Sequence, residues 1–179
     1  MRLFIAMDLP PRAVKMLQSL QKQLLQAGME GRVVAPENLH LTLQFIGEAT
    51  QQQADAICQA IEHAFMDEMA PLVNIAGVSA FVRGTGDTVY ARLAGNTPAI
   101  DRLQQKTLAA LRPLEVTLEN RSFVPHITLL RNARFGSRNI AVRSESFFMW
   151  NISVYASHLG QGRGGSPRYE CLCRVPLCR

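Results

Sequence analysis

The stretch Asn38-Leu39-His40-Leu41-Thr42-Leu43 is matched in pattern, close to half the chain later, by Pro125-His126-Ile127-Thr128-Leu129. Each stretch holds a histidine and a threonine separated by one aliphatic residue. Side chains alternate between the two faces of a β-strand, so each stretch, as a strand, sends its histidine and threonine to one face and its aliphatic residues to the other. The aliphatic face can anchor a core while the imidazole and the hydroxyl face a shared cleft. We therefore predict two strands that carry the chemistry of this protein.

The repeat indicates a duplicated unit. Only four histidines occur among the 179 residues. Composition alone puts a threonine two residues after two of them about once in a hundred sequences. The separation of nearly half the chain favours two related halves that each contribute one strand.

The composition fits one folded domain. Hydrophobic residues make up 47% of the 179 residues, enough for a substantial core in one domain or in two lobes of one domain. The formal net charge of +5 and the pI near 9.4 favour an acidic partner, and the arginine-rich second half suits a polyanion such as RNA. A basic solvated surface that keeps the protein in solution is an equally good explanation of the charge.

No feature of the sequence indicates a membrane or a metal. The apolar run over residues 3–7 is too short for a signal peptide, and no segment approaches the length of a membrane span, so we expect a cytoplasmic protein. The cysteines lack the paired spacing of a zinc site, and we expect reduced thiols. They are Cys58, Cys171, Cys173 and Cys178.

Local signals predict the elements. Apolar residues at helical spacing predict a helix between Pro11 and Gly28. Thr50 and Gln53 form a capping-box start for a second helix, and Thr97 as N-cap begins a third that Pro113 stops. Strands are predicted over 2–9, 39–46, 72–81, 88–93, 147–157 and 168–175, besides the one with the second pattern.

This order of elements predicts an α+β fold in a single domain over residues 1–179. Hairpin-like pairs dominate the later part of the chain, which favours mostly antiparallel sheets. We expect two pseudo-symmetric lobes, each a mostly antiparallel sheet with helices on its outer face, around a central groove.

Two histidines across a groove can perform acid and base chemistry near neutral pH, because the pKa of imidazole lies near 6.5. A neutral ring can take a proton from a water that attacks phosphorus while a protonated ring gives one to the departing alkoxide. Thr42 and Thr128 can donate hydrogen bonds to the non-bridging phosphate oxygens. No metal or cofactor is needed for this scheme.

The segments 40–48 and 125–131 closely resemble the two signatures of the 2H phosphoesterase superfamily. Within it the chain is most similar to the LigT-like RNA 2′,3′-cyclic phosphodiesterases, also called 2′-5′ RNA ligases. The opening segment 2–10 and the tail around 155–157 and 168–169 also match the style of this family. The resemblance therefore spans almost the whole chain.

The resemblance implies a bilobal fold with a pseudo-two-fold axis and a metal-independent opening of terminal 2′,3′-cyclic phosphates to 2′-phosphates. It implies RNA ends as partners, tRNA fragments or nucleotides among them, and a weak reverse 2′-5′ ligation. It also implies that His40 is the general acid and His126 the general base. The near symmetry of the two patterns gives no reason in the sequence to prefer this direction. Nothing in the sequence demands more than a monomer.

Other residues are weaker candidates. Arg131 resembles the basic residue that follows the second signature, and a guanidinium binds phosphate as a fork. By alternation it shares the face of Ile127 and Leu129, so reaching the cleft requires a strand end or a bulge. Phe45 could stack on a base, but alternation places it in the core.

Two arginines, Arg163 and Arg168, are candidates for contacts with the RNA backbone. His158 follows a predicted strand and could approach the groove, whereas His63 is expected on the surface of the second helix. The sequence leaves their roles open.

Two other functions stay open. The chain could be an RNA-binding module without catalysis, although binding alone would not need two titrating groups in matched positions. It could also be a phosphodiesterase for small cyclic nucleotides or for 2′-5′ linked oligonucleotides.

Overall fold

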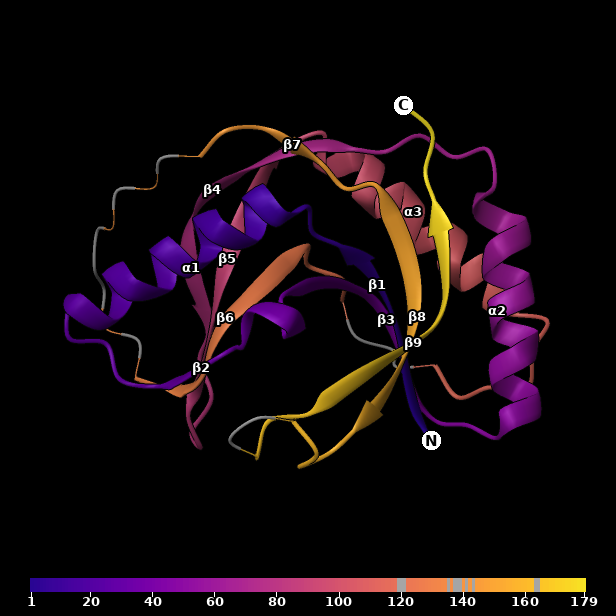
Figure 1. Ribbon diagram of the computed structural model, residues 1–179, viewed down its shortest axis with the longest axis horizontal. Helices are drawn as coiled ribbons and strands as arrows, with labels where there is room; N and C mark the ends of the chain where they lie inside the picture. Colours follow the sequence, from indigo (N-terminus) through magenta and orange to yellow (C-terminus); the bar gives the residue numbers. More distant parts are fainter. Residues whose placement is uncertain (119–121, 135, 137–139, 141, 143, 163–164) are drawn as a thin grey trace.

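The computed structural model describes residues 1–118, 122–134, 136, 140, 142, 144–162 and 165–179 (Figure 1). The helices are α1 (Pro11–Gln26), α2 (Gln51–Phe65) and α3 (Thr97–Leu111), with a 3-10 turn at Pro36–Asn38. The strands are β1 (Arg2–Asp8), β2 (Arg32–Val33), β3 (His40–Glu48), β4 (Leu72–Phe81), β5 (Asp87–Gly95), β6 (His126–Ala133), β7 (Phe147–Phe148), β8 (Asn151–His158) and β9 (Arg168–Pro176).

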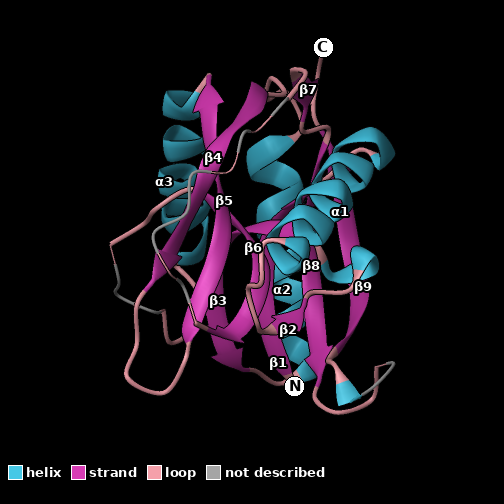
Figure 2. Cartoon of the chain, turned by 90° about the vertical axis from the view of Figure 1, so that its left-hand side faces the viewer, coloured by secondary structure: helices cyan, strands magenta, loops and turns pink. Residues whose placement is uncertain are grey.

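The strands form two antiparallel sheets. The order is β3-β1-β8-β9 in the first sheet and β2-β6-β5-β4-β7 in the second. Helices α2 and α3 contact the first sheet through β9 and β3, whereas α1 contacts the second through β6 (Figure 1). Figure 2 shows α3 and α1 on opposite sides of the molecule. The predicted α+β class, with two mostly antiparallel sheets, is confirmed.

The two sheets are interleaved along the chain. The first sheet combines β1 and β3 from the beginning of the sequence with β8 and β9 from its end, and the second takes the strands between them. The single strand predicted over 147–157 is therefore wrong. β7 pairs with β4 in the second sheet, and β8 pairs with β1 in the first. Met149 and Trp150 carry the chain from one sheet to the other.

The predicted start of α2 is confirmed, whereas the predicted N-cap of α3 is wrong by one residue. At α2 the Thr50 hydroxyl accepts a hydrogen bond from the Gln53 amide at 3.2 Å, and the Gln53 side chain accepts one from the Thr50 amide at 2.9 Å, as a capping box requires. At α3 the N-cap is Asn96 and not Thr97, which is already helical. The described part of the chain contains no helix long and apolar enough to cross a membrane, and all four cysteines are free.

The aliphatic residues of both patterns are buried, as alternation predicts. Leu41, Ile127 and Leu129 are fully buried, and Leu43 is 2% exposed. The hydrophobic effect thus fixes the face on which each histidine lies, because a shift of one residue would exchange the two faces.

Both strands contain a bulge at the residue after the threonine. Ala6 pairs with Thr42 and Ile5 with Gln44, so Leu43 has no partner on β1. In β6, Tyr90 pairs with Thr128 and Val89 with Leu130, so Leu129 is the extra residue. An extra residue reverses the alternation of the residues that follow it.

The bulge in β6 is held by buried hydrogen bonds. The carbonyl oxygen of Leu129 accepts from the Gln21 side chain of α1 at 3.0 Å and from the Val34 amide at 2.9 Å. Gln21 is itself only 4% exposed. The carbonyl at the bulge is thus fully hydrogen-bonded, which makes the bulge a stable part of the fold.

The reversed alternation explains the faces on which the side chains of Phe45 and Arg131 lie. Phe45 is 47% exposed, and its ring lies 6.0 Å from that of Phe4. The prediction that Phe45 belongs to the core is therefore wrong. Arg131 lies on the histidine face of β6, since the bulge at Leu129 supplies the change of side that alternation alone did not allow.

Candidate active site

His40 stands at the beginning of β3 with both ring nitrogens in hydrogen bonds. Its Nδ1 lies 2.8 Å from the carbonyl oxygen of Asn38, and its Nε2 lies 3.0 Å from Oγ1 of Thr42. A carbonyl oxygen only accepts, so Nδ1 carries the hydrogen. In the neutral ring Nε2 then accepts from the Thr42 hydroxyl, which leaves this nitrogen as the atom that can gain or lose a proton.

His126 is held in the same way at the beginning of β6. Its Nδ1 donates to the carbonyl oxygen of Val124 at 2.6 Å, two residues earlier in the chain, as His40 does to Asn38. The repeat in the sequence is therefore also a repeat in geometry. Each imidazole is fixed through Nδ1 and keeps Nε2 for chemistry.

Each imidazole also lies against two aromatic rings. The ring centroids of Phe4 and Tyr169 lie 4.9 and 5.5 Å from that of His40, and those of Phe81 and Tyr90 lie 5.0 and 5.3 Å from that of His126. The aromatic walls exclude water from one side of each ring and restrict its rotation.

The two histidines share one electrostatic environment. Burial, together with the nearby charges of Arg131 and His126, lowers the pKa of His40 from 6.5 to about 4, against the raising effect of the hydrogen bond with the Asn38 carbonyl. Burial and Arg131 also lower the pKa of His126. β3 and β6 contact each other across the two sheets. The structure thus brings His40, His126 and Arg131 together, with Thr42 and Thr128 on the same faces.

Arg32 and Tyr169 belong to the same region and were missed in the sequence. Arg32 on β2 is the ladder partner of Arg131, so the two guanidinium groups start from one face of the second sheet. Burial raises the pKa of Tyr169, while Arg131 and Arg32 lower it. Strand register places Arg32 beside Arg131, whereas Tyr169 belongs to the other sheet and comes near them only through the packing of the two sheets.

Three remaining candidates, His158, Arg168 and His63, are not among the described residues found in contact with the two imidazoles. Nε2 of His158 is 2.7 Å from a carboxylate oxygen of Glu170 on the neighbouring strand β9, and Arg168 is exposed at the start of that strand. His63 is exposed on α2, as expected. Arg163 lies outside the described residues. A polar cavity of about 850 Å³ lies between the β4–β5 turn and the end of β6, and its lining includes none of the five predicted site residues.

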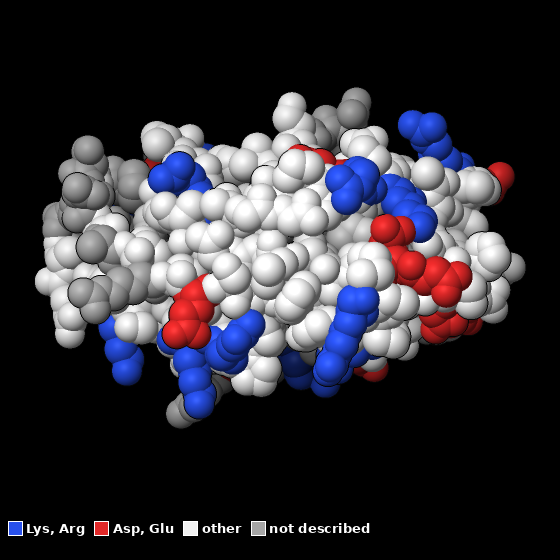
Figure 3. Space-filling view, turned by 90° about the horizontal axis from the view of Figure 1, so that it is seen from above, with Lys and Arg blue, Asp and Glu red and all other residues white. Residues whose placement is uncertain are grey.

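Charge on the surface is mixed. On the face seen in Figure 3, basic side chains are interspersed with acidic ones and with wide areas that carry neither. Among the described residues, no group of three or more His, Cys, Asp or Glu side chains could hold a metal ion.

The low pKa of His40 makes a prediction for stability. The unfolded chain binds a proton at His40 near pH 6.5 and the folded chain only near pH 4. The unfolded state therefore binds more protons in this window, so the contribution of His40 to the free energy of unfolding is constant above pH 6.5 and falls as the pH drops toward 4. We expect His40 to account for about 3 kcal/mol of this fall.

Urea unfolding at pH 7.5, 5 and 4 measures this fall in the free energy of unfolding, with His40→Asn as the matched variant. The side-chain nitrogen of asparagine can replace Nδ1 in the bond to Asn38, but it does not titrate. The pH dependence should be shallower in the variant than in the wild type. Equal slopes would show that His40 keeps its ordinary pKa in the folded protein.

Comparison with known proteins agrees with the fold and with the first pattern. The model of the family described as LigT like Phosphoesterase matches residues 8–86, which include His40 and Thr42. An RNA 2′,3′-cyclic phosphodiesterase of Escherichia coli (strain K12) is 29% identical over 98% of this chain and 96% of its own length. One of Geobacillus stearothermophilus is 26% identical over 80% of this chain, but the match spans only 47% of that relative.

The solved structures extend the match to both sheets. The crystal structure of E. coli LigT complexed with 3′-AMP has a TM-score of 0.78 at 26% identity and covers 99% of this chain and 98% of that one. The MHV ns2 PDE domain shares the fold at 14% identity, with a TM-score of 0.61 over 86% of this chain and 98% of its own. Sequence and fold together place the chain among proteins similar to the LigT-like phosphoesterases. These matches confirm the resemblance to the LigT-like phosphoesterases seen in the motifs of the chain.

Proposed function

We propose that this protein hydrolyses 2′,3′-cyclic phosphates at RNA ends to 2′-phosphates, with His40 and His126 as the acid–base pair and without a metal ion. The observation that carries the proposal is the shared geometry of the two imidazoles. Each is fixed through Nδ1 by a carbonyl oxygen two residues earlier and keeps Nε2 for proton transfer. The relatives named RNA 2′,3′-cyclic phosphodiesterase and the LigT complex with 3′-AMP support the same substrate class.

The reaction balances with one water. Nε2 of His126 takes a proton from the water, whose oxygen forms a bond to phosphorus. The bond from phosphorus to the 3′ oxygen breaks, and Nε2 of His40 gives that oxygen its proton. The direction follows the family, in which the first histidine is the acid. In-line displacement requires the general base and the general acid on opposite sides of phosphorus, which suits histidines on two different sheets.

Substrate binding has to change the protonation of His40. With a pKa of about 4 the free ring is neutral at pH 7. A bound phosphate brings negative charge next to Arg131 and the two rings, which offsets the cationic neighbours and raises both pKa values. Once Nε2 of His40 is protonated, it no longer accepts from Thr42, and the Thr42 hydroxyl can donate to a non-bridging oxygen instead. Thr128 offers the matching hydroxyl on the other strand.

A short RNA that ends in a 2′,3′-cyclic phosphate tests the proposal. In excess EDTA the protein should convert it to an RNA that ends in a 2′-phosphate, which a general phosphomonoesterase removes and a 3′-specific phosphatase does not, whereas the cyclic substrate resists both. Activity that appears only after a divalent metal is added would exclude the metal-free mechanism. Salt-sensitive RNA binding without any product would favour the non-catalytic alternative.

We further propose that the protein acts as a cytoplasmic monomer on tRNA fragments or nucleotides and catalyses a weak 2′-5′ ligation. Ligation follows the same course as the hydrolysis, with a 5′ hydroxyl in the place of water: its oxygen bonds to phosphorus, the bond to the 3′ oxygen breaks, and a 2′-5′ linkage remains. Incubating one RNA that ends in a cyclic phosphate with another that has a free 5′ hydroxyl should give a small yield of 2′-5′ linked product.

A further inference from the structure

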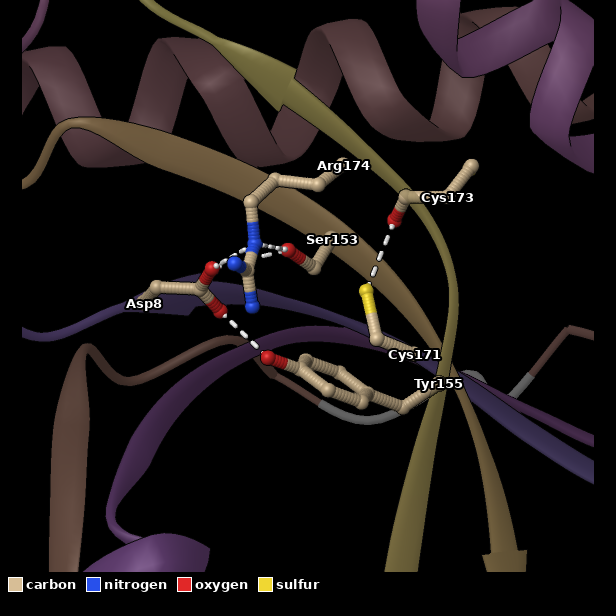
Figure 4. Close-up of polar contacts among 6 residues, drawn as sticks. All are labelled: Asp8, Ser153, Tyr155, Cys171, Cys173 and Arg174. Atoms are coloured by element: carbon tan, nitrogen blue, oxygen red, sulfur yellow. Dashed lines mark hydrogen bonds and ion pairs between the residues drawn. The ribbon is translucent and has the colours of Figure 1, made fainter.

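A second polar cluster lies on the first sheet and is not part of the two-histidine geometry. Arg174 on β9 reaches across β8 to Asp8 at the end of β1 (Figure 4). One oxygen of Asp8 accepts from Nε of Arg174 at 2.9 Å and from the Ser153 hydroxyl at 2.8 Å, and the other accepts from the Tyr155 hydroxyl at 2.7 Å. Three strands thus hold one guanidinium in place.

The cluster stands on the same face as His40. Asp8 is the ladder partner of His40, and residues directly opposite each other in a ladder project to the same face. The ring of Tyr155 stacks on that of Phe4 at 5.3 Å, and Phe4 in turn lies 4.9 Å from the ring of His40. Asp8 therefore lies directly opposite His40, and it holds the Arg174 guanidinium on the same face of the first sheet.

The cluster is buried at Ser153 and Asp8 and exposed at Arg174. Ser153 is fully buried and the Asp8 side chain is 16% exposed, whereas that of Arg174 is 53% exposed. Nε carries only one of the five N–H donors of a guanidinium, so donors remain for a ligand beside the contacts with Asp8, Ser153 and Tyr155. The Tyr155 oxygen and the Asp8 carboxylate raise the pKa of Arg174, so the group stays charged.

This arrangement differs from an ordinary surface ion pair. A free arginine side chain loses rotational freedom when it binds a ligand, whereas Asp8 and Ser153 have already fixed the position of this one. Asp8 offsets much of the positive charge, so the remaining N–H groups, rather than a general positive field, provide the attraction. Such a fork matches two oxygens of one phosphate group.

We propose that Arg174 binds the phosphodiester that precedes the terminal cyclic phosphate, so that this site takes oligonucleotide ends in preference to single nucleoside cyclic phosphates. The inference rests on the proposed function, because it places the reacting phosphate at His40 and His126. Asp8 is then a positioning residue that holds the guanidinium one nucleotide away from the reaction. A nucleoside cyclic phosphate has no second phosphate and gains nothing from this contact.

Three substrates and one variant test the proposal. The substrates are adenosine 2′,3′-cyclic phosphate, the dinucleotide ApA with a terminal cyclic phosphate, and the same dinucleotide with an uncharged methylphosphonate linkage. In the wild type kcat/KM should be about tenfold to a hundredfold higher for the charged dinucleotide than for the methylphosphonate, the range for a charge-assisted hydrogen bond. Arg174→Met should remove this preference.

Controls separate the contact from a loss of folding. Arg112→Met, at the C-terminal end of α3, removes a charge from the outer helical layer and should keep the preference. Arg174→Lys keeps the charge but not the fork and should recover only part of it. The preference is a ratio measured on one protein sample, so a partly unfolded variant still reports it.

Two outcomes would overturn the proposal: a wild type that does not distinguish the charged linkage from the uncharged one, or an Arg174→Met variant that retains the distinction. If the wild type turns over none of the substrates, the proposed function is wrong and the contact is tested by binding. Calorimetry with ApA 2′-phosphate and adenosine 2′-phosphate then measures the same preference. Its absence there would overturn the inference too.

Discussion

His126→Asn and His40→Asn are each expected to lower kcat for an RNA 2′,3′-cyclic phosphate by about 10²- to 10⁴-fold, the usual contribution of a positioned general acid or base. Asparagine is the sharpest substitution because its side-chain nitrogen can replace Nδ1. The bonds to the carbonyl oxygens of Asn38 and Val124 can persist, and only Nε2 is lost. Steady-state kinetics measure the loss, and thermal unfolding checks that each variant is folded.

The double variant should lose much less than the product of the two single losses. Two groups that act in one concerted step depend on each other, so removing the second costs little once the first is gone. His63→Asn is the matched control, since His63 is exposed on α2. A single variant that keeps more than about a tenth of the wild-type kcat would remove that histidine from the proton transfers.

A substrate with sulfur in place of the 3′ oxygen identifies the acid. A thiolate has a conjugate-acid pKa near 8.5 and leaves without protonation. If His40 is the acid, His40→Asn should lose little activity on this substrate, whereas His126→Asn should remain impaired. The opposite result would reverse the direction that the family implies. This test matters because the free His40 is neutral at pH 7 and has to gain its proton in the complex.

Arg131→Met is expected to lower kcat/KM by about 10²- to 10³-fold, as when a donor aimed at a developing negative charge is removed. Arg131 lowers the pKa values of both His40 and His126, so its charge acts at the place where the reacting phosphate is proposed to bind. Lysine at this position keeps the charge but loses the fork, and should restore only part of the activity.

The same substitution should also move the pH profile. Removing a positive charge makes protonation of both imidazoles easier, so their pKa values rise toward 6.5. The bell-shaped profile of kcat/KM should therefore shift to higher pH in Arg131→Met and stay near its wild-type position in Arg131→Lys. A methionine variant with an unchanged profile would show that Arg131 is too distant to act on the rings.

Alternation predicted the faces of the histidines, threonines and aliphatic residues, because these lie before the bulges. It failed for Phe45 and left Arg131 unresolved because both lie after them. A bulge depends on the partner strand and on groups such as the Gln21 amide, which is far away in the sequence. The adjacent apolar residues Leu129 and Leu130 are the local sign that period-two alternation breaks there.

The interleaving of the two sheets also could not be predicted from local sequence patterns. Residues 147–157 have the composition of one strand, yet Phe147 pairs in one sheet and Ile152 in the other. The same limit applies to Arg32 and Asp8, whose places beside Arg131 and His40 follow from strand register alone. Periodicity describes one element at a time, whereas these positions depend on which elements become neighbours.

The interleaved order also has a consequence for synthesis on the ribosome. The strands β4, β5 and β6 are consecutive in the chain, so the core of the sheet that carries His126 can form while later residues are still being added. β1 lies between β3 and β8, and one of its edges stays unpaired until residues 151–158 emerge. The half of the site with His40 is therefore completed last: a nascent chain that stops before β8 has Phe4 beside His40 but still lacks Tyr169, the second ring against it.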